Sequence, residues 1–184
     1  MKKLALLAAL AVGISTPAMA QDDQGFGGLK VGVIGGYDHI TVVPNGDKQT
    51  KGGFTYGGTV GYDFDVNGLL LGAEAEYSDS TTDRAIGNGL TFEPNREIYG
   101  GIRLGGEVAK NTLLYAKGGY VNSKMSVYGD GLDYSHKNDG YRLGAGVEHI
   151  RNNVFGRIEY RFSDYADSLR PQRHQAVAAV GLRF

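Results

Sequence analysis

The sequence contains no cysteine and no tryptophan, and proline accounts for only 4 of its 184 residues. Without cysteine the chain can form no disulfide, no Cys-ligated zinc site, no iron–sulfur cluster and no thiol nucleophile. Basic residues are not in surplus either, since 19 Lys and Arg stand against 20 Asp and Glu. This balance argues against a nucleic-acid-binding surface, which needs an excess of positive charge. The length allows at most one ordinary domain or two small ones.

Long hydrophobic runs are missing too, except for the eleven residues Leu4–Ile14. A spanning helix needs ~20 apolar residues, so this run is too short to cross a bilayer. Lys2 and Lys3 precede it, and Ala18-Met19-Ala20 follows it as a small-x-small cleavage site. We therefore predict a signal peptide over residues 1–20 and a mature domain over residues 21–184. Loss of the two lysines would change the net charge from −1 to −3.

Glycine and tyrosine are the residue types in excess. The chain has 30 glycines, more than twice the usual ~7%, and 12 tyrosines. Glycine is a poor helix residue, tyrosine favours strands, and the mature sequence alternates apolar and polar residues with period two. We predict eight strands, each close to the ~9–11 residues that a tilted strand needs to cross a bilayer. They are Leu29–His39, Phe54–Phe64, Leu69–Tyr77, Glu97–Val108, Thr112–Val121, Tyr141–His149, Val154–Phe162 and His174–Phe184.

The connections between these strands alternate between short and long. Three are tight turns that contain Asn or Gly, which tolerate the positive φ of hairpin turns: Asp65–Gly68, Ala109–Asn111 and Ile150–Asn153. The other four are longer and polar: Ile40–Gly53, Ser78–Arg96, Asn122–Gly140 and Ser163–Arg173. An up-and-down barrel gathers alternate connections at opposite rims, and outer-membrane barrels have short periplasmic turns and longer extracellular loops. The pattern predicts an all-β, eight-stranded antiparallel barrel with its long connections outside the cell.

Sorting each predicted strand by parity separates charged residues from apolar ones. One face is apolar, with mostly aliphatic and aromatic residues. Its titratable side chains other than tyrosine are His39, His149 and His174, all at strand ends. The other face carries fifteen charged residues: Lys30, Asp38, Asp63, Glu74, Glu76, Glu97, Arg103, Glu107, Lys117, Arg142, Glu148, Arg157, Glu159, Arg161 and Arg183.

Three features favour a barrel with this charged face inside over a soluble barrel with an apolar centre. Eleven glycines lie on the charged face and six on the apolar face, and small residues leave room for long side chains in a narrow lumen. The aromatic residues of the apolar face gather near both rims, as in the girdles of membrane barrels. The charged face holds seven basic and eight acidic residues, a balance that buried charges require.

Two segments carry a family resemblance. The last strand, Ala176–Phe184, is alternating and apolar and ends on an aromatic residue, which resembles the assembly signal of Gram-negative outer-membrane proteins. The stretch Arg157–Tyr165 is similar to the penultimate strand of small opacity-type and OmpA-like barrels, often described as porin-family proteins. The resemblance implies location in the Gram-negative outer membrane and insertion by machinery that reads the strand ending in Phe184. Because nothing follows the barrel, no peptidoglycan-binding domain is expected, and OmpX-like barrels are the closer comparison.

Motifs for chemistry are not found: the sequence has no P-loop, HExxH or GxSxG. The four histidines have no metal-ligand spacing, and Glu74 with Glu76 is read as part of a structural ion-pair network. We therefore predict no catalytic, cofactor-binding or metal-ligating residues, no cofactor, and no enzyme. The enzymatic alternative is a lipid A-modifying barrel, for which the nearest His and hydroxyl pairs are His39 with Thr41 and Ser135 with His136.

The predicted function is that of a non-enzymatic, monomeric envelope protein that supports membrane integrity or adhesion through its long extracellular loops. The first alternative is a narrow or gated, porin-like channel, and the lipid A-modifying enzyme is the second. An open diffusion pore is not expected, since porins with water-filled channels use ~16–18 strands. Expected partners are outer-membrane lipid, lipopolysaccharide and a host or surface ligand. Basic residues suited to lipopolysaccharide phosphates are Lys48, Lys51, Arg84, Arg96, Arg170 and Arg173. Apolar contact points in the loops are Phe92, Tyr128, Leu132, Tyr134, Tyr165 and Leu169.

Overall fold

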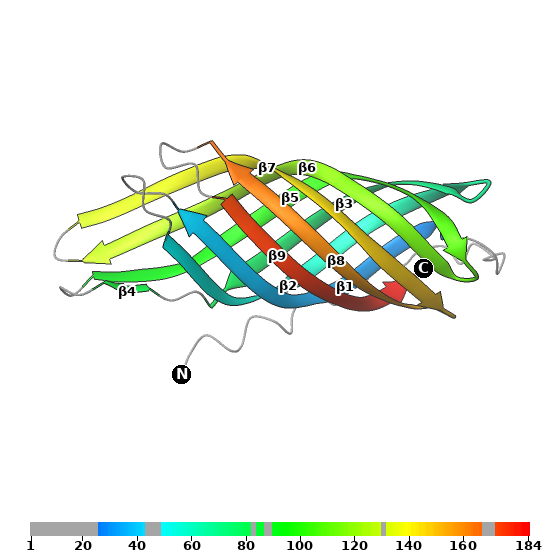
Figure 1. The fold of residues 1–184 in the computed structure, drawn as a ribbon, viewed down its shortest axis with the longest axis horizontal. Helices are drawn as coiled ribbons and strands as arrows, with labels where there is room; N and C mark the ends of the chain where they lie inside the picture. The colour runs from blue at the N-terminus through cyan, green and yellow to red at the C-terminus, as the bar shows by residue number, and fades with distance from the viewer. Residues whose placement is uncertain (1–25, 43–48, 82–83, 87–89, 130–131, 167–171) are drawn as a thin grey trace.

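The computed structural model describes residues 26–42, 49–81, 84–86, 90–129, 132–166 and 172–184. In these residues the chain forms nine antiparallel strands, of which eight close a barrel (Figure 1). A pairing of β3 with β5 joins the two ends of the sheet, and β4 lies beside the outer end of β5. The strands are β1 (Gly28–Val42), β2 (Gln49–Val66), β3 (Leu69–Ser80), β4 (Arg84–Ile86), β5 (Leu90–Ala109), β6 (Thr112–Gly129), β7 (Leu132–Arg151), β8 (Val154–Tyr165) and β9 (Gln172–Arg183).

The predicted eight-stranded antiparallel barrel is confirmed. The described part of the chain contains no helix with the length and hydrophobicity of a membrane span. The predicted signal peptide, residues 1–20, lies outside the described residues and stays a prediction.

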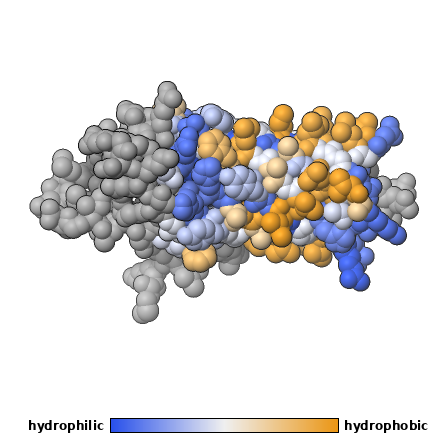
Figure 2. All heavy atoms as spheres, viewed as in Figure 1, coloured by the Kyte–Doolittle hydropathy of each residue, from blue (hydrophilic) through white to orange (hydrophobic). Residues whose placement is uncertain are grey.

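The outer surface of the barrel is apolar, as the parity of the strands predicts. Ile158, Phe54 and Ile102 are 72%, 66% and 63% exposed, although they are among the most hydrophobic residues of the chain. Figure 2 shows that hydrophobic residues gather in a band, the apolar belt, on this face of the barrel, with polar residues at either end of the band. Tyrosines and phenylalanines mark the edges of the belt: Tyr37, Phe54, Tyr56, Tyr77, Tyr120, Tyr141, Tyr160 and Phe162 toward the long connections, and Tyr62, Phe64 and Phe184 toward the short turns.

The three short turns form as their Asn and Gly residues predict. Asn67, Asn111 and Asn152 have φ between 55° and 60°, and Gly68 has φ 83°. In the first turn the N–H of Gly68 also donates a hydrogen bond to Asp65 Oδ1 at 2.9 Å. These local signals end each strand pair sharply on the periplasmic side, so the predicted strand ends there are correct to within two residues.

On the opposite side the predicted strand ends are wrong, because much of the predicted loops is strand. β6 and β7 stay paired from the barrel out to Gly129 and Leu132, about nine residues beyond the Tyr120–Tyr141 pair. At ~3.4 Å per residue this hairpin rises roughly 30 Å along the strand direction past the aromatic girdle. β5 accompanies it, with pairing that continues to Thr91. A sheet of β4, β5, β6 and β7 therefore projects beyond the membrane.

The segment before β1 enters the barrel instead of leaving it as a free tail. Gly28, with φ 119°, turns the chain at the periplasmic mouth. This turn brings Phe26 into a cluster of buried apolar residues, where it is 5% exposed. The N–H of Phe26 donates to Asp65 Oδ2 at 3.1 Å, which fixes the segment against β2.

Two adjacent glycines on β5 provide a test of the inward and outward faces. A Cβ atom on Gly101 would lie 2.5 Å from the Gly118 carbonyl oxygen and 2.2 Å from Tyr99 Oη, whereas one on Gly100 would meet nothing within 4 Å. We expect Gly101→Ala to lower the free energy of unfolding by about 1–3 kcal/mol, since overpacking forces backbone shifts. Gly100→Ala should be neutral or stabilising by up to ~1 kcal/mol. Urea unfolding in lipid vesicles measures both, and equal effects would contradict the assignment of faces.

Candidate functional site

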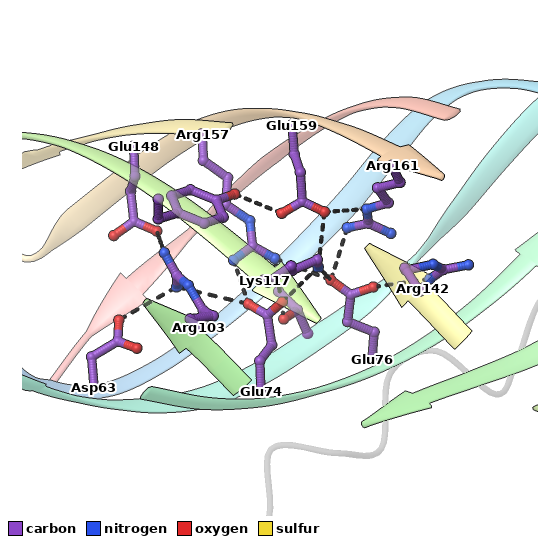
Figure 3. A network of polar contacts seen from close by, with 12 residues as sticks. Asp63, Glu74, Glu76, Arg103, Lys117, Arg142, Glu148, Arg157, Glu159 and Arg161 are labelled. Atoms are coloured by element: carbon purple, nitrogen blue, oxygen red, sulfur yellow. Dashed lines mark hydrogen bonds and ion pairs between the residues drawn. The ribbon is translucent and has the colours of Figure 1, made fainter. Parts of the chain in front are cut away.

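The lumen of the barrel is filled by a network of buried ion pairs (Figure 3). At its centre, Lys117 Nζ on β6 lies 2.8 Å from Glu74 and 2.7 Å from Glu76, both on β3. It also lies 2.8 Å from Glu159 on β8, so one ammonium group bridges opposite walls of the barrel. Arg161 reaches back from β8 to Glu76 at 2.8 Å and also pairs with Glu159. Ion pairs thus connect β3, β6 and β8 across the centre of the lumen.

The network continues from this centre to the periplasmic side. Arg103 approaches Glu74 at 3.8 Å, Glu148 at 3.0 Å and Asp63 at 3.4 Å. Lys30 lies near the start of β1 and points into the lumen, where it pairs with Asp63 at 2.6 Å and also with Glu148. The ion pairs therefore link β1, β2, β5 and β7 near the short turns.

On the outer side the same network reaches the level of the aromatic girdle. Arg142 lies 3.6 Å from Glu76 and pairs with Glu97, and Arg173 lies 2.7 Å from Glu97. Arg173 also pairs with Asp38, to which its Nε donates at 2.9 Å. Seven basic and seven acidic side chains, each 5% exposed or less, thus form one continuous and electrically balanced set. They are Lys30, Arg103, Lys117, Arg142, Arg157, Arg161, Arg173, Asp38, Asp63, Glu74, Glu76, Glu97, Glu148 and Glu159.

Aromatic and aliphatic side chains occupy the rest of the lumen, and none of them was predicted there from the sequence. Tyr115 is buried, donates to Glu159 Oε2 at 2.6 Å and carries the Arg103 guanidinium 4.2 Å from its ring centre. Phe155 is 1% exposed and packs with Leu70 and Phe26 in an apolar cluster. Their inward parity was readable from the strands, since Tyr115 and Phe155 lie two residues before the charged Lys117 and Arg157 and so share a face with them. The lumen is consequently plugged by rings as well as by ion pairs.

One residue of the predicted charged face is exposed. Glu107 is exposed at the turn between β5 and β6, where it accepts a hydrogen bond from the N–H of Asn111 at 3.0 Å. The register between β5 and β6 shifts between Glu107 and Ala109. Glu107 itself still pairs with Leu113, which is buried in the lumen, so it keeps the parity of the charged face. It is exposed because it lies at the periplasmic end of β5, where the barrel ends and water reaches the side chain. The other fourteen residues of the predicted face are all buried, as predicted.

Two residues predicted for the extracellular loops also lie inside the barrel. Arg173 is 3% exposed and held by Asp38 and Glu97, so it is not available to lipopolysaccharide phosphates. Tyr165 is 6% exposed and donates to Glu97 Oε2 at 2.5 Å, so it is not a loop contact point. Both were assigned to a loop because β8 and β9 extend further than the apolar alternation does.

Of the other five residues predicted to bind lipopolysaccharide phosphates, the structure describes the side chain of one. Arg96 is exposed at the outer girdle, with its guanidinium 6.0 Å from the ring centre of Tyr77. Lys48 and Arg170 lie outside the described residues, and so do the side chains of Lys51 and Arg84. The side chains of the loop contact points Phe92, Tyr128, Leu132 and Tyr134, and all of Leu169, are likewise not described.

The predicted enzymatic candidates lie on strands. His39 and Thr41 share the outward face of β1, opposite His174 and Gln172 of β9. Ser135 and His136 belong to the projecting part of β7, where the side chains lie outside the described part of the chain. Within the described residues, no group of three or more His, Asp or Glu side chains is arranged to hold a metal ion.

The family of the chain follows from its sequence as well as its fold. Residues 6–184 match the family described as outer membrane protein beta-barrel domain. The chain belongs to this family. A 22 kDa outer membrane protein of Rhizobium leguminosarum is 34% identical over 65% of this chain and 56% of its own length. A 31 kDa outer-membrane immunogenic protein of Brucella melitensis is 28% identical over 88% of this chain and 87% of its own length. The protein is therefore a β-barrel of the Gram-negative outer membrane, as the resemblance implied.

Solved barrels show the same fold at low identity. Ail, the attachment invasion locus protein of Yersinia pestis, superposes with a TM-score of 0.60 at 16% identity, over 85% of this chain and 99% of Ail. That structure contains the heparin analogue sucrose octasulfate. Neisserial surface protein A superposes with a TM-score of 0.61 at 16% identity, over 84% of this chain and 97% of its own. At this identity the likeness extends to the fold alone.

Proposed function

We propose that this protein is a non-enzymatic barrel with two separable roles: the barrel supports the outer membrane, and the sheet that projects from it binds surface ligands. The observation that carries the proposal is the paired extension of β5, β6 and β7 beyond the aromatic girdle. Hydrogen-bonded strands hold their shape in water, so this part of the chain presents an ordered surface outside the membrane. The outer-membrane location of the family is consistent with both roles.

The lumen supports this proposal because it leaves little room for transport. Arg103, Arg142 and Arg161 are among the largest side chains in the barrel, and each is 2% exposed or less. A small solute could cross only if several ion pairs and the Phe26, Leu70 and Phe155 cluster separated together. An eight-stranded barrel has an interior just wide enough for side chains. Function is therefore expected at the outer surface.

The described relatives fit a surface role without defining it. Ail is named an attachment invasion locus protein, and the Brucella relative an outer-membrane immunogenic protein. A protein that meets host cells or antibodies must present part of its chain outside the membrane, which the projecting sheet does here. The nearly neutral charge of this chain does not favour a dedicated polyanion site.

A trimmed hairpin tests whether the two roles separate. The register pairs Ser123 with Asn138, so residues 124–137 can be excised and the two strands rejoined by Asn-Gly, which suits a two-residue hairpin turn. The variant should insert normally and show the same heat-modifiable migration on gels. In a deletion strain it should restore resistance to detergent and bile salts, while adhesion of the bacteria to cultured host cells falls to the level of the deletion strain.

The same strains distinguish the alternatives. Restoration of binding by the trimmed barrel would contradict the assignment of ligand binding to the projecting sheet. A changed lipid A mass profile in the deletion strain would favour the lipid A-modifying enzyme instead. Stepwise conductance of the purified barrel in planar bilayers would favour a channel.

Arg96 is the described basic residue best placed to meet lipopolysaccharide phosphate. It is exposed at the outer girdle, and the Tyr77 ring supports its guanidinium. We expect Arg96→Ala to lower the concentration of polymyxin that inhibits growth about twofold, since one exposed ionic contact contributes ~1 kcal/mol or less. Arg151→Ala removes an exposed arginine from a periplasmic turn and serves as the control. Equal sensitivity of the two variants would argue against a phosphate contact at Arg96.

A further inference from the structure

Two histidines that are 135 positions apart in the sequence face each other on the outside of the barrel. The register of β1 with β9 places His39 directly opposite His174. His39 is exposed and His174 is half-buried, and both lie one alternation beyond Tyr37 and Ala176, at the outer edge of the apolar belt. Nothing in the spacing of the histidines along the sequence shows this arrangement.

The distance between the two histidine backbones follows from the hydrogen bonds of the same strand pair. Leu29 and Phe184 exchange both backbone hydrogen bonds, at 3.1 Å and 2.8 Å. His39 and His174 lie ten residues further along each strand with no break in register, so they also form a hydrogen-bonded pair. In such a pair the Cα atoms are ~5.5 Å apart, and side chains on the same face are within contact distance.

His174 is already held in a way that suits a metal ligand. Its Nδ1 lies 2.6 Å from Tyr160 Oη, and its ring is 5.1 Å from the ring of Phe162. When Nδ1 carries the proton and donates it to Tyr160, Nε2 presents its lone pair. Ligating histidines usually have such a partner on the other ring nitrogen, which fixes the tautomer and orients the ring.

We infer that His39 and His174 form a two-imidazole site for a divalent transition-metal ion, with Cu²⁺, Ni²⁺ and Zn²⁺ as the fitting class. Imidazole suits these ions, and nitrogen ligands bind them at ~2.0–2.1 Å, which two side chains on facing strand positions can reach. The protein supplies two ligands, so water or phosphate oxygens of the surrounding headgroups complete the coordination. The site is independent of the projecting sheet and of the proposed binding role.

Copper binding to the tag-free full-length mature chain in detergent micelles tests the inference. All variants carry His136→Gln, so that the histidine of the projecting hairpin does not contribute. We expect one Cu²⁺ per chain with micromolar affinity and an electron paramagnetic resonance signal with two nitrogen ligands. Either His39→Gln or His174→Gln should weaken binding about tenfold or more, because the second imidazole acts at high effective concentration. The double variant should be little worse than either single one.

Two further variants make the result decisive. His149→Gln removes the histidine at the periplasmic turn, which bonds Thr112 Oγ1 at 3.0 Å, and should leave binding unchanged. Tyr160→Phe removes the partner of His174 Nδ1 and should weaken binding by about 10-fold, within the range for such partners. Independent binding at each histidine would instead halve the stoichiometry in each single variant at unchanged affinity. That result, or no loss in either variant, would overturn the inference.

Discussion

Replacing Glu76 with glutamine is expected to lower the free energy of unfolding by about 3–5 kcal/mol. Glu76 lies 2.7 Å from Lys117, 2.8 Å from Arg161 and 3.2 Å from Arg157, and it is 3% exposed. Removing its charge leaves these cations with one carboxylate fewer, although all three remain buried. An uncompensated buried charge costs several kcal/mol, which is more than the net worth of most intact pairs. Urea titration in lipid vesicles, monitored by tyrosine fluorescence, measures the loss.

Two companion variants separate charge balance from loss of a carboxylate as such. Glu107→Gln removes an exposed glutamate from a periplasmic turn and should change stability by no more than ~0.5 kcal/mol. Adding Lys117→Met to Glu76→Gln restores equal numbers of buried positive and negative groups. This double variant should therefore be more stable than the sum of its single substitutions predicts. A strictly additive double variant would show that the lumen does not behave as one network.

The prediction of the barrel from sequence succeeded where lipid imposes a pattern and failed where it does not. Between the two aromatic girdles each outward residue must be apolar, so alternation located the strands and their faces. Beyond the outer girdle both faces of a strand meet water, and the alternation ends while the hydrogen bonds continue. β5, β6 and β7 were therefore cut short at Glu97, Val121 and Tyr141, although pairing runs far past these residues.

Inside the lumen, sequence parity predicted which charges are buried but not which of them meet. The pairs join strands that are distant in the sequence, as for Lys30 with Glu148 and Arg157 with Glu74. Their geometry depends on the stagger of the closed sheet, which no single strand encodes. The same holds for His39 and His174, because closure of the sheet brings β1 beside β9. Contacts between strands that meet only when the sheet closes are thus the part of the structure that a single sequence does not predict.

A charge placed on the outer face tests the orientation of the whole barrel. Ile102 is 63% exposed in the middle of the apolar belt, and its neighbours across the sheet are the small residues Ala73 and Gly118. Ile102→Arg should lower the free energy of unfolding in lipid by about 2–4 kcal/mol, the usual cost of arginine on a lipid face at the bilayer midplane. The small neighbours offer no cover for the guanidinium, so the full cost is expected.

Val108 supplies the matched control, because it is an apolar residue of the same strand with nearly the same exposure, 61%, but lies at the register shift next to the periplasmic turn. Val108→Arg should cost about 0–1 kcal/mol, since its side chain reaches the interface. The ratio of the two effects depends on depth in a bilayer and not on exposure to solvent. If both variants were equally stable, the surface would behave as if it faced water, and the membrane orientation of every strand would have to be reversed. If Ile102→Arg alone is destabilised, the apolar belt faces hydrocarbon and the ion pairs of the lumen are necessarily inside.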